Sequence, residues 1–488
     1  ARGTHLLTPI LFSINRSNTH HHHRTTNSMD NIPNLTILEH SRISPPPSTI
    51  GHRSLPLTFF DIAWLLFPPV HHLYFYHFPY SKSHFTETVI PNLKHSLSIT
   101  LQHYFPFVGK LIVYPNPHDS TRKPEIRHVE GDSVALTFAE TTLDFNDLSA
   151  NHPRKCENFY PLVPPLGNAV KESDYVTLPV FSVQVTYFPN SGISIGLTNH
   201  HSLSDANTRF GFLKAWASVC ETGEDQPFLK NGSPPVFDRV VVNPQLYENR
   251  LNQTRLGTFY QAPSLVGSSS DRVRATFVLA RTHISGLKKQ VLTQLPMLEY
   301  TSSFTVTCGY IWSCIVKSLV NMGEKKGEDE LEQFIVSVGC RSRLDPPLPE
   351  NYFGNCSAPC IVTIKNGVLK GENGFVMAAK LIGEGISKMV NKKGGILEYA
   401  DRWYDGFKIP ARKMGISGTP KLNFYDIDFG WGKAMKYEVV SIDYSASVSL
   451  SACKESAQDF EIGVCFPSMQ MEAFGKIFND GLESAIAS

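Results

Sequence analysis

The stretch FSVQVTYFPNSGISIGLTNHHSLSD, residues 181–205, decides how this chain folds. Apolar and polar residues alternate on both sides of a turn at 189–192, and this pattern predicts a β-hairpin. Next, Ser204 and Asp205 precede a helical pattern of apolar residues, where a Ser or Asp side chain can cap the exposed amides. His201 is therefore expected at the point where a strand ends and a helix begins.

His201 is the candidate general base. Its HxxxD spacing with Asp205 is expected about once by chance in a chain of this length, so the position carries more weight than the pattern. An imidazole at the mouth of a strand is mostly neutral near pH 7 and can accept a proton from a bound hydroxyl. The alternative is a buried structural histidine. Asp205 could orient the imidazole, but a capping role in the first helical turn is favoured. His200 should point the opposite way and serve packing.

A serine hydrolase is a second interpretation of the same region. Residues 192–196 match GxSxG, which would make Ser194 a nucleophile. That motif requires the serine in a tight turn between a strand and a helix, whereas Ser194 lies inside the alternating strand. The nearest base, His201, follows only seven residues later. This context argues against a hydrolase.

The rest of the chain predicts a mixed α/β protein with two domains, each built from a sheet with flanking helices. Helices are expected at 86–102, 304–320 and 374–390, and strands at 273–278 and 334–340. Residues 221–260 are polar and rich in Gly and Pro, which is typical of a crossover linker. We therefore expect an N-terminal domain at 29–220 and a C-terminal domain at 261–488. Residues 1–28, before Met29, are interpreted as a non-native or disordered leader.

Composition narrows the class of ligand. A net charge of +1 gives no field for nucleic acid or an acidic membrane surface, so a small-molecule substrate is favoured. The nine cysteines are scattered and lack CxxC pairs, which predicts reduced thiols in a cytoplasmic protein and no metal site. No signal peptide or apolar run of about 20 residues was recognised, so a membrane anchor is not expected.

A second motif, Asp428-Phe429-Gly430-Trp431-Gly432, is too specific to arise by chance. Aromatic residues between glycines describe a tightly packed turn. We interpret this motif as structural support, with Asp428 forming an ion pair. Arg341 and Arg343 are its candidate partners.

The two motifs together resemble the plant BAHD acyltransferases, and the resemblance covers 29–488. Further similarity lies in the blocks 55–61, 90–94 and 352–356. The last of these blocks resembles the branch that acylates anthocyanins, flavonoids and related phenolic glycosides. Block 341–347 is closer to members that use malonyl-CoA, whereas 307–312 is shared with members that use hydroxycinnamoyl donors. Ala206 and Ala434 depart from the common pattern without touching a proposed catalytic atom.

The resemblance implies a monomer with a channel between its domains and His201 inside that channel. Acyl-CoA would be a co-substrate, with no permanently bound cofactor, and a malonyl group would pass directly to a sugar hydroxyl of a phenolic glycoside. A malonyl carboxylate needs a cation, for which Arg341 and Arg343 are candidates unless they serve structural ion pairs. The alternatives are a coumaroyl or caffeoyl donor and a catalytically silent binding relative.

Overall fold

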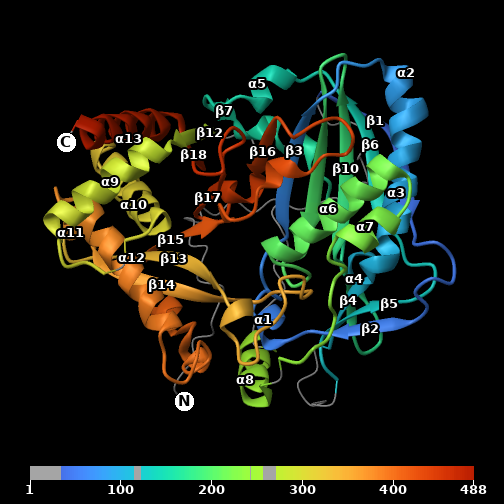
Figure 1. Cartoon of the computed structure of the whole chain (residues 1–488), viewed down its shortest axis with the longest axis horizontal. Helices are drawn as coiled ribbons and strands as arrows, with labels where there is room; N and C mark the ends of the chain where they lie inside the picture. Colours follow the sequence, from blue (N-terminus) through green and yellow to red (C-terminus); the bar gives the residue numbers. More distant parts are fainter. Residues whose placement is uncertain (1–33, 115–121, 242, 256–270, 300, 488) are drawn as a thin grey trace, which may run out of the picture.

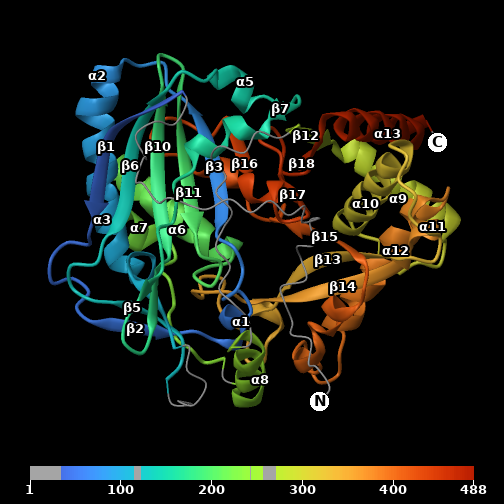
Figure 2. The same cartoon turned by 180° about the vertical axis from the view of Figure 1, so that it is seen from behind.

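The computed structural model describes residues 34–114, 122–241, 243–255, 271–299 and 301–487. Figures 1 and 2 show two lobes side by side. The first half of the chain forms most of one lobe, and the second half forms most of the other. The predicted leader at 1–28 lies outside the described residues.

A six-stranded sheet forms the core of the first lobe. Its strand order is β1 (Leu35–Ile43), β6 (Val134–Thr141), β10 (Phe181–Phe188), β11 (Gly192–Asn199), β3 (Val70–His77) and β16 (Lys436–Val439). The predicted hairpin is confirmed, since β10 and β11 pair antiparallel from Phe181 opposite Asn199 to Phe188 opposite Gly192. Every residue of both strands is buried, as expected for central strands covered on both faces.

Two helices of this lobe pack against each other, α3 (Ile90–His103) and α6 (Ala206–Thr222). Trp216 of α6 is fully buried, and its indole nitrogen donates a hydrogen bond of 3.1 Å to the Ser96 hydroxyl of α3. The helix predicted at 86–102 begins earlier than expected, with α2 (Lys82–His84) and a π-helical turn at Phe85–Val89 before α3. Trp216 therefore joins the helix that follows His201 to the body of the lobe.

The second lobe is built on a seven-stranded sheet. Its order is β14 (Ser357–Lys365), β13 (Leu331–Gly339), β15 (Arg412–Ser417), β17 (Ser447–Ala452), β18 (Phe460–Pro467), β12 (Arg272–Leu279) and β7 (Arg154–Lys155). Its helices are α9 (Arg281–Gln294), α10 (Ser303–Asn321), α11 (Asn366–Lys370), α12 (Gly374–Val390) and α13 (Ser468–Ala487). The strands and helices predicted for this half of the chain are all present, the helix at 374–390 with the predicted ends and the others with ends that move by one to three residues.

Two strands are exchanged between the halves of the chain. The early strand β7 completes the seven-stranded sheet, and the late strand β16 completes the six-stranded sheet. At this crossing Glu438 of β16 is fully buried between Arg154 (2.7 Å) and Arg274 (3.2 Å). Burial by itself raises the pKa of Glu438, but the two guanidinium groups overcome that effect and lower it to about 2. A buried ion-pair network therefore joins the two lobes.

A small third sheet lies at the edge of the first lobe. It contains β2 (Arg53–Pro56), β5 (Glu125–His128), β4 (Lys110–Val113), β9 (Val176–Pro179) and β8 (Val170–Lys171). The predicted crossover at 221–260 contains two helices, α7 (Gln226–Asn231) and α8 (Pro244–Arg255). Helix α8 packs against α1 (Phe59–Ile62). The crossover thus packs against the body of the protein over part of its length.

Helix α10 is the one described helix that is long and apolar enough to cross a membrane by length and composition. Of its most apolar 18-residue window, 72% is buried inside the protein. It contacts α12, α13 and α9. This burial is typical of a core helix, and it explains why the stretch is so apolar.

Candidate active site

His201 lies where the sequence places it, in the turn between β11 and α6. Its imidazole stacks on the indole of Trp64, with ring centroids 3.7 Å apart and planes 5° from parallel. Phe67 meets the same imidazole edge-on at 5.8 Å. Nδ1 of His201 is buried and has no hydrogen-bond partner among the described residues. Aromatic packing, rather than a carboxylate, therefore surrounds the ring.

Three separate blocks of sequence meet at His201. Asp61 comes from block 55–61, Asn355 from block 352–356, and His201 from the HxxxD motif. The Asn355 side-chain amide donates to the His201 carbonyl at 2.9 Å and to Asp61 Oδ1 at 3.2 Å. Asp61 Oδ1 also accepts the backbone N–H of Asn355 at 2.8 Å. These bonds fix the backbone of His201 to both lobes, a role for Asn355 that its sequence block did not reveal.

The carboxylate of Asp205 binds groups other than the imidazole. Its Oδ1 caps α6 by accepting the N–H of Thr208 at 3.0 Å. Both carboxylate oxygens pair with the guanidinium of Arg341, at 2.6 and 3.0 Å. The predicted capping role is therefore observed directly, and the alternative, in which Asp205 orients the imidazole, has no supporting contact.

Arg341 and Arg343, the predicted partners of Asp428, bind other groups. Arg341 is buried, and besides Asp205 it donates to the carbonyls of Tyr352 and Gly354, each at 3.0 Å. Arg343 is exposed and donates to the Gly339 carbonyl at 2.6 Å. This geometry favours the structural interpretation of Arg341 over the hypothesis that it binds an acyl-donor carboxylate, and it leaves Arg343 on the surface.

The prediction that Asp428 forms an ion pair with either arginine is wrong. Asp428 Oδ1 instead accepts the N–H groups of Gly430 and Gly432, each at 2.8 Å, and so closes its own turn. Both glycines have φ near +90°, a conformation that glycine adopts without a steric penalty. A carboxylate beside two glycines can bind the turn locally, so no cation is needed. Asp428 thus holds the motif together by itself.

The motif turn packs onto the first lobe. The ring of Phe429 lies edge-on to Trp216 of α6, with centroids 5.0 Å apart. Tyr76 of β3 packs edge-on to both Phe429 and Trp431, and its hydroxyl donates to the Ile427 carbonyl at 3.0 Å. The motif therefore supports the sheet and helix that flank His201, as the structural interpretation expects.

Arg209 is the cation that the sequence analysis overlooked. It lies one helical turn after Asp205 on α6, and only 5% of its surface is exposed. Its described polar partners are the hydroxyl groups of Tyr74 and Tyr437 rather than a carboxylate, and its Nε is buried without a hydrogen bond. It is close enough to lower the pKa of both His72 and His201. A charged residue on an otherwise apolar helical face is the signal that could have identified it.

The Transferase family profile matches residues 34–480 of this chain. The chain belongs to this family, the BAHD acyltransferases. It is 40% identical to malonyl-coenzyme:anthocyanin 5-O-glucoside-6'''-O-malonyltransferase of Salvia splendens, covering 92% of this chain and 96% of that protein. Coumaroyl-CoA:anthocyanidin 3-O-glucoside-6''-O-coumaroyltransferase 2 of Arabidopsis thaliana is 35% identical, with coverage of 92% and 97%. The protein is therefore an acyl-CoA-dependent acyltransferase, which excludes the hydrolase interpretation.

The fold of this BAHD acyltransferase agrees with that of vinorine synthase. The TM-score is 0.65 at 18% sequence identity, and the match covers 90% of this chain and 96% of the other. The predicted mixed α/β class with two domains is confirmed. Ser194 lies inside β11 and is fully buried, so the geometry of a nucleophile elbow is absent at this position.

The proton affinity of His201, the candidate base, is lowered mainly by its burial. Burial, together with the positive charge of Arg209, lowers the pKa of His201 from 6.5 to about 4. The neutral, proton-accepting form therefore predominates at every pH well above 4. A low pKa weakens His201 as a base in the free enzyme, but it ensures that the lone pair is available at neutral pH.

This pKa predicts the pH profile. Because protonation removes the base, kcat/KM for the acceptor at saturating acyl-CoA should be constant from about pH 5 upwards and fall below pH 4. Initial rates between pH 3.5 and 8 would measure the acid limb, with enzyme integrity checked by returning samples to pH 7. An acid limb near 6.5 would contradict the assigned environment of His201.

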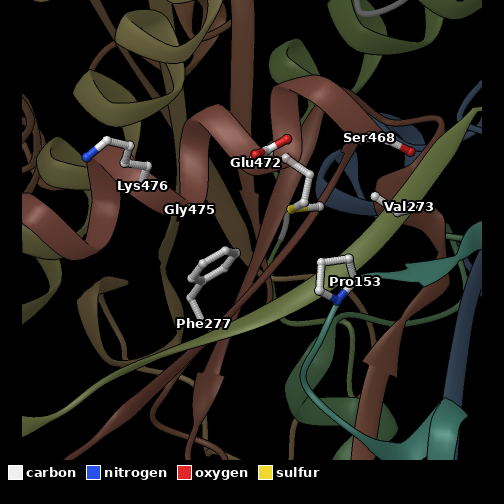
Figure 3. Close-up of a pocket in the computed structure, with 8 residues that line it drawn as sticks. Pro153, Val273, Phe277, Ser468, Glu472, Gly475 and Lys476 are labelled. Atoms are coloured by element: carbon white, nitrogen blue, oxygen red, sulfur yellow. The ribbon is translucent and has the colours of Figure 1, made fainter.

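A pocket of about 410 Å³ lies between β12 and α13 (Figure 3). Phe277 and Met471 give it apolar walls, and Glu472 and Lys476 are also among its lining residues. None of the predicted site residues lines it. We therefore place the chemistry at His201 and not in this pocket.

One group of possible metal ligands occurs within the described part of the chain. Sγ of Cys156, Sγ of Cys465 and a carboxylate oxygen of Asp443 lie within 4.8 Å of one another. Asp443 is 3.4 Å from the guanidinium of Arg274, and a structural zinc site normally has four ligands. We assign no metal to this group. All nine cysteines are free and buried.

Proposed function

We propose that this acyltransferase moves a malonyl group from malonyl-CoA to a sugar hydroxyl of a phenolic glycoside of the anthocyanin or flavonoid type. The relatives support this choice, since phenolic glucoside malonyltransferase 1 of Nicotiana tabacum is 39% identical over 85% of this chain and 91% of its own length. The observation that carries the proposal is a neutral His201 close to the buried guanidinium of Arg209, whose Nε has no hydrogen-bond partner. His201 can accept the proton of the sugar hydroxyl, and Arg209 can bind the carboxylate of an acidic acyl group.

In the proposed reaction, His201 takes the proton of the sugar hydroxyl while the oxygen attacks the thioester carbonyl. The resulting tetrahedral oxyanion collapses, the carbon–sulfur bond breaks, and CoA leaves as a thiolate that receives the proton from His201. Transfer is direct, so none of the nine buried cysteines and no serine is required as a nucleophile. Asp205 and Asp428 maintain the local structure around the base.

Arg209 is the residue proposed to recognise the malonyl carboxylate. A buried carboxylate requires a cation, and charge-assisted hydrogen bonds to carboxylates are among the strong polar contacts in proteins. Arg209 is buried beside His201 without a described carboxylate partner, whereas Arg341 is already paired with Asp205. A hydroxycinnamoyl group carries no such carboxylate and would gain little from Arg209.

Arg209→Met is expected to lower kcat/KM for malonyl-CoA by about 10- to 100-fold, the effect of losing one charge-assisted hydrogen bond. The loss with acetyl-CoA or coumaroyl-CoA should be much smaller, because neither acyl group presents a carboxylate. The losses with malonyl-CoA and with the other donors are measured from initial rates and product mass, with a panel of flavonoid and anthocyanin glucosides as acceptors. The matched control is Arg343→Met, which removes an exposed arginine and should leave the donor ratio unchanged.

The donor panel also tests the remaining alternatives. Faster transfer from coumaroyl-CoA than from malonyl-CoA by the unaltered protein would favour the aromatic acyltransferase, which the coumaroyltransferase relatives keep as the second candidate. Equal losses for all donors in Arg209→Met would contradict the carboxylate role. No product with any pair of donor and acceptor would favour the catalytically silent relative.

We further propose a cytoplasmic monomer whose substrates approach His201 from the junction of the lobes. Free, buried cysteines support a reducing compartment. The contact of Asn355, from the second half of the chain, with His201 supports a site at the junction. Sedimentation equilibrium of the purified protein would test the monomer.

A further inference from the structure

Among the described residues, no carboxylate orients the imidazole of His201 through a hydrogen bond. Asp205, the residue that sequence spacing offers for this task, binds Arg341 and the cap of α6. Nδ1 of His201 is buried without a partner. A catalytic base must nevertheless be held close to its productive geometry, because small displacements lower the rate strongly. Apart from Asn355, whose side chain interacts with His201, the groups that can fix the plane of this ring are the aromatic rings around it.

Trp64 and Phe67 supply the contacts that restrict the ring. Trp64 covers one face of the imidazole at 3.7 Å with nearly parallel planes, and Phe67 approaches its edge at 5.8 Å. Trp64 and Phe67 also pack edge to face on each other at 4.8 Å. The three rings therefore form one cluster, in which rotation of the imidazole would break the stacked contact.

The segment that carries Trp64 is itself fixed to His201. The N–H of Trp64 donates to the Asp61 carbonyl at 3.1 Å, and the Asp61 carboxylate caps α1 through the N–H of Thr58 at 2.9 Å. Asp61 also binds Asn355, which binds the His201 carbonyl. The same segment thus holds the backbone of His201 through hydrogen bonds and its ring through stacking.

We propose that Trp64 is a positioning residue that sets the plane of the His201 imidazole and takes the place of the orienting carboxylate of other histidine bases. The proposal rests on the proposed function of His201 as general base. Stacking of this kind is worth about 0.5–1.5 kcal/mol beyond the burial of area, which is enough to select one ring orientation among the rotamers of the side chain.

The test compares Trp64→Leu with Trp64→Phe. The leucine variant keeps apolar contact but has no ring to stack, and its kcat should fall by about 10- to 100-fold while KM for acyl-CoA changes little. The phenylalanine variant restores an aromatic face and should recover most of kcat. Trp403→Leu is the matched control, because this tryptophan packs on Phe60 of α1 at 6.1 Å without a described ring contact to His201. It should retain kcat.

A spectroscopic measurement makes the test independent of turnover. With labelled histidine, the His201 ring resonances should be shifted upfield by the stacked indole, assigned by their loss in His201→Ala, and should move downfield in Trp64→Leu. Unchanged resonances, or unchanged kcat with unchanged KM in Trp64→Leu, would overturn the proposal. If the unaltered protein transfers no acyl group, the proposed function fails, and the resonances alone still decide whether Trp64 orients the ring.

Discussion

His201→Ala is expected to abolish acyl transfer almost completely while leaving the fold intact. General base catalysis contributes about 10²- to 10⁴-fold to such reactions, and within the described residues the two nearest histidines offer no substitute. His200 is buried and its Nδ1 accepts the N–H of Ser202 at 3.2 Å. Burial lowers the pKa of His72 well below 6.5, and its Nδ1 contacts the Tyr437 hydroxyl at 2.9 Å. Steady-state kcat with malonyl-CoA and a glucoside acceptor measures the loss.

A control for this variant lies one residue away. In His200→Asn the Asn oxygen can replace Nδ1 as the acceptor for Ser202, so the turn before α6 should persist and kcat should stay within a few fold. Both variants should unfold at similar denaturant concentrations. Retention of more than about a tenth of wild-type kcat by His201→Ala, with the fold intact, would exclude His201 as the principal base.

The position of His201 could be predicted because its determinants are local. Alternation over β10 and β11 and a capping residue at Asp205 are properties of about 25 consecutive residues, and local patterns of this kind specify a strand, a turn and a helix start. The motif at 428–432 could be interpreted as a packed turn for the same reason. The sequence did not predict that Asp428 binds the N–H groups of its own turn. An acidic residue suggests an ion pair with a cation, and two arginines elsewhere in the chain offered one.

The contacts around His201 depend on residues far apart in the chain, which explains why the sequence did not reveal them. Arg341 and Asp205 are 136 residues apart, and Asn355 and Asp61 are 294 apart. No periodicity connects such positions. The resemblance of blocks 55–61, 341–347 and 352–356 to the family pointed to these residues but not to the groups that they contact. The sequence also did not predict the exchange of β7 and β16 between the two sheets. These short edge strands have too few residues to show the alternation of apolar and polar side chains that identifies a strand.

Asp205→Ala is the second variant with a large expected effect, and this effect is on stability. The variant leaves the guanidinium of Arg341 buried, 6% exposed, without its carboxylate, and breaking such a pair from one side typically costs about 3–5 kcal/mol. It also removes the cap of α6, whose loss alone costs about 1 kcal/mol. The free energy of unfolding, measured by urea titration, should fall accordingly, and activity should be lost with the fold.

Asp205→Asn separates the two contributions. Asparagine caps a helix about as well as aspartate, so this variant should lose the ion pair but keep the cap and be more stable than Asp205→Ala by about 1 kcal/mol. Combining Asp205→Asn with Arg341→Met removes both charges and should recover part of the stability, because no unpaired cation then remains buried. Additive losses in the double variant would contradict the ion pair. If the double variant is stable and active, Asp205 acts through structure; if it is stable but inactive, the carboxylate also contributes to the reaction at His201.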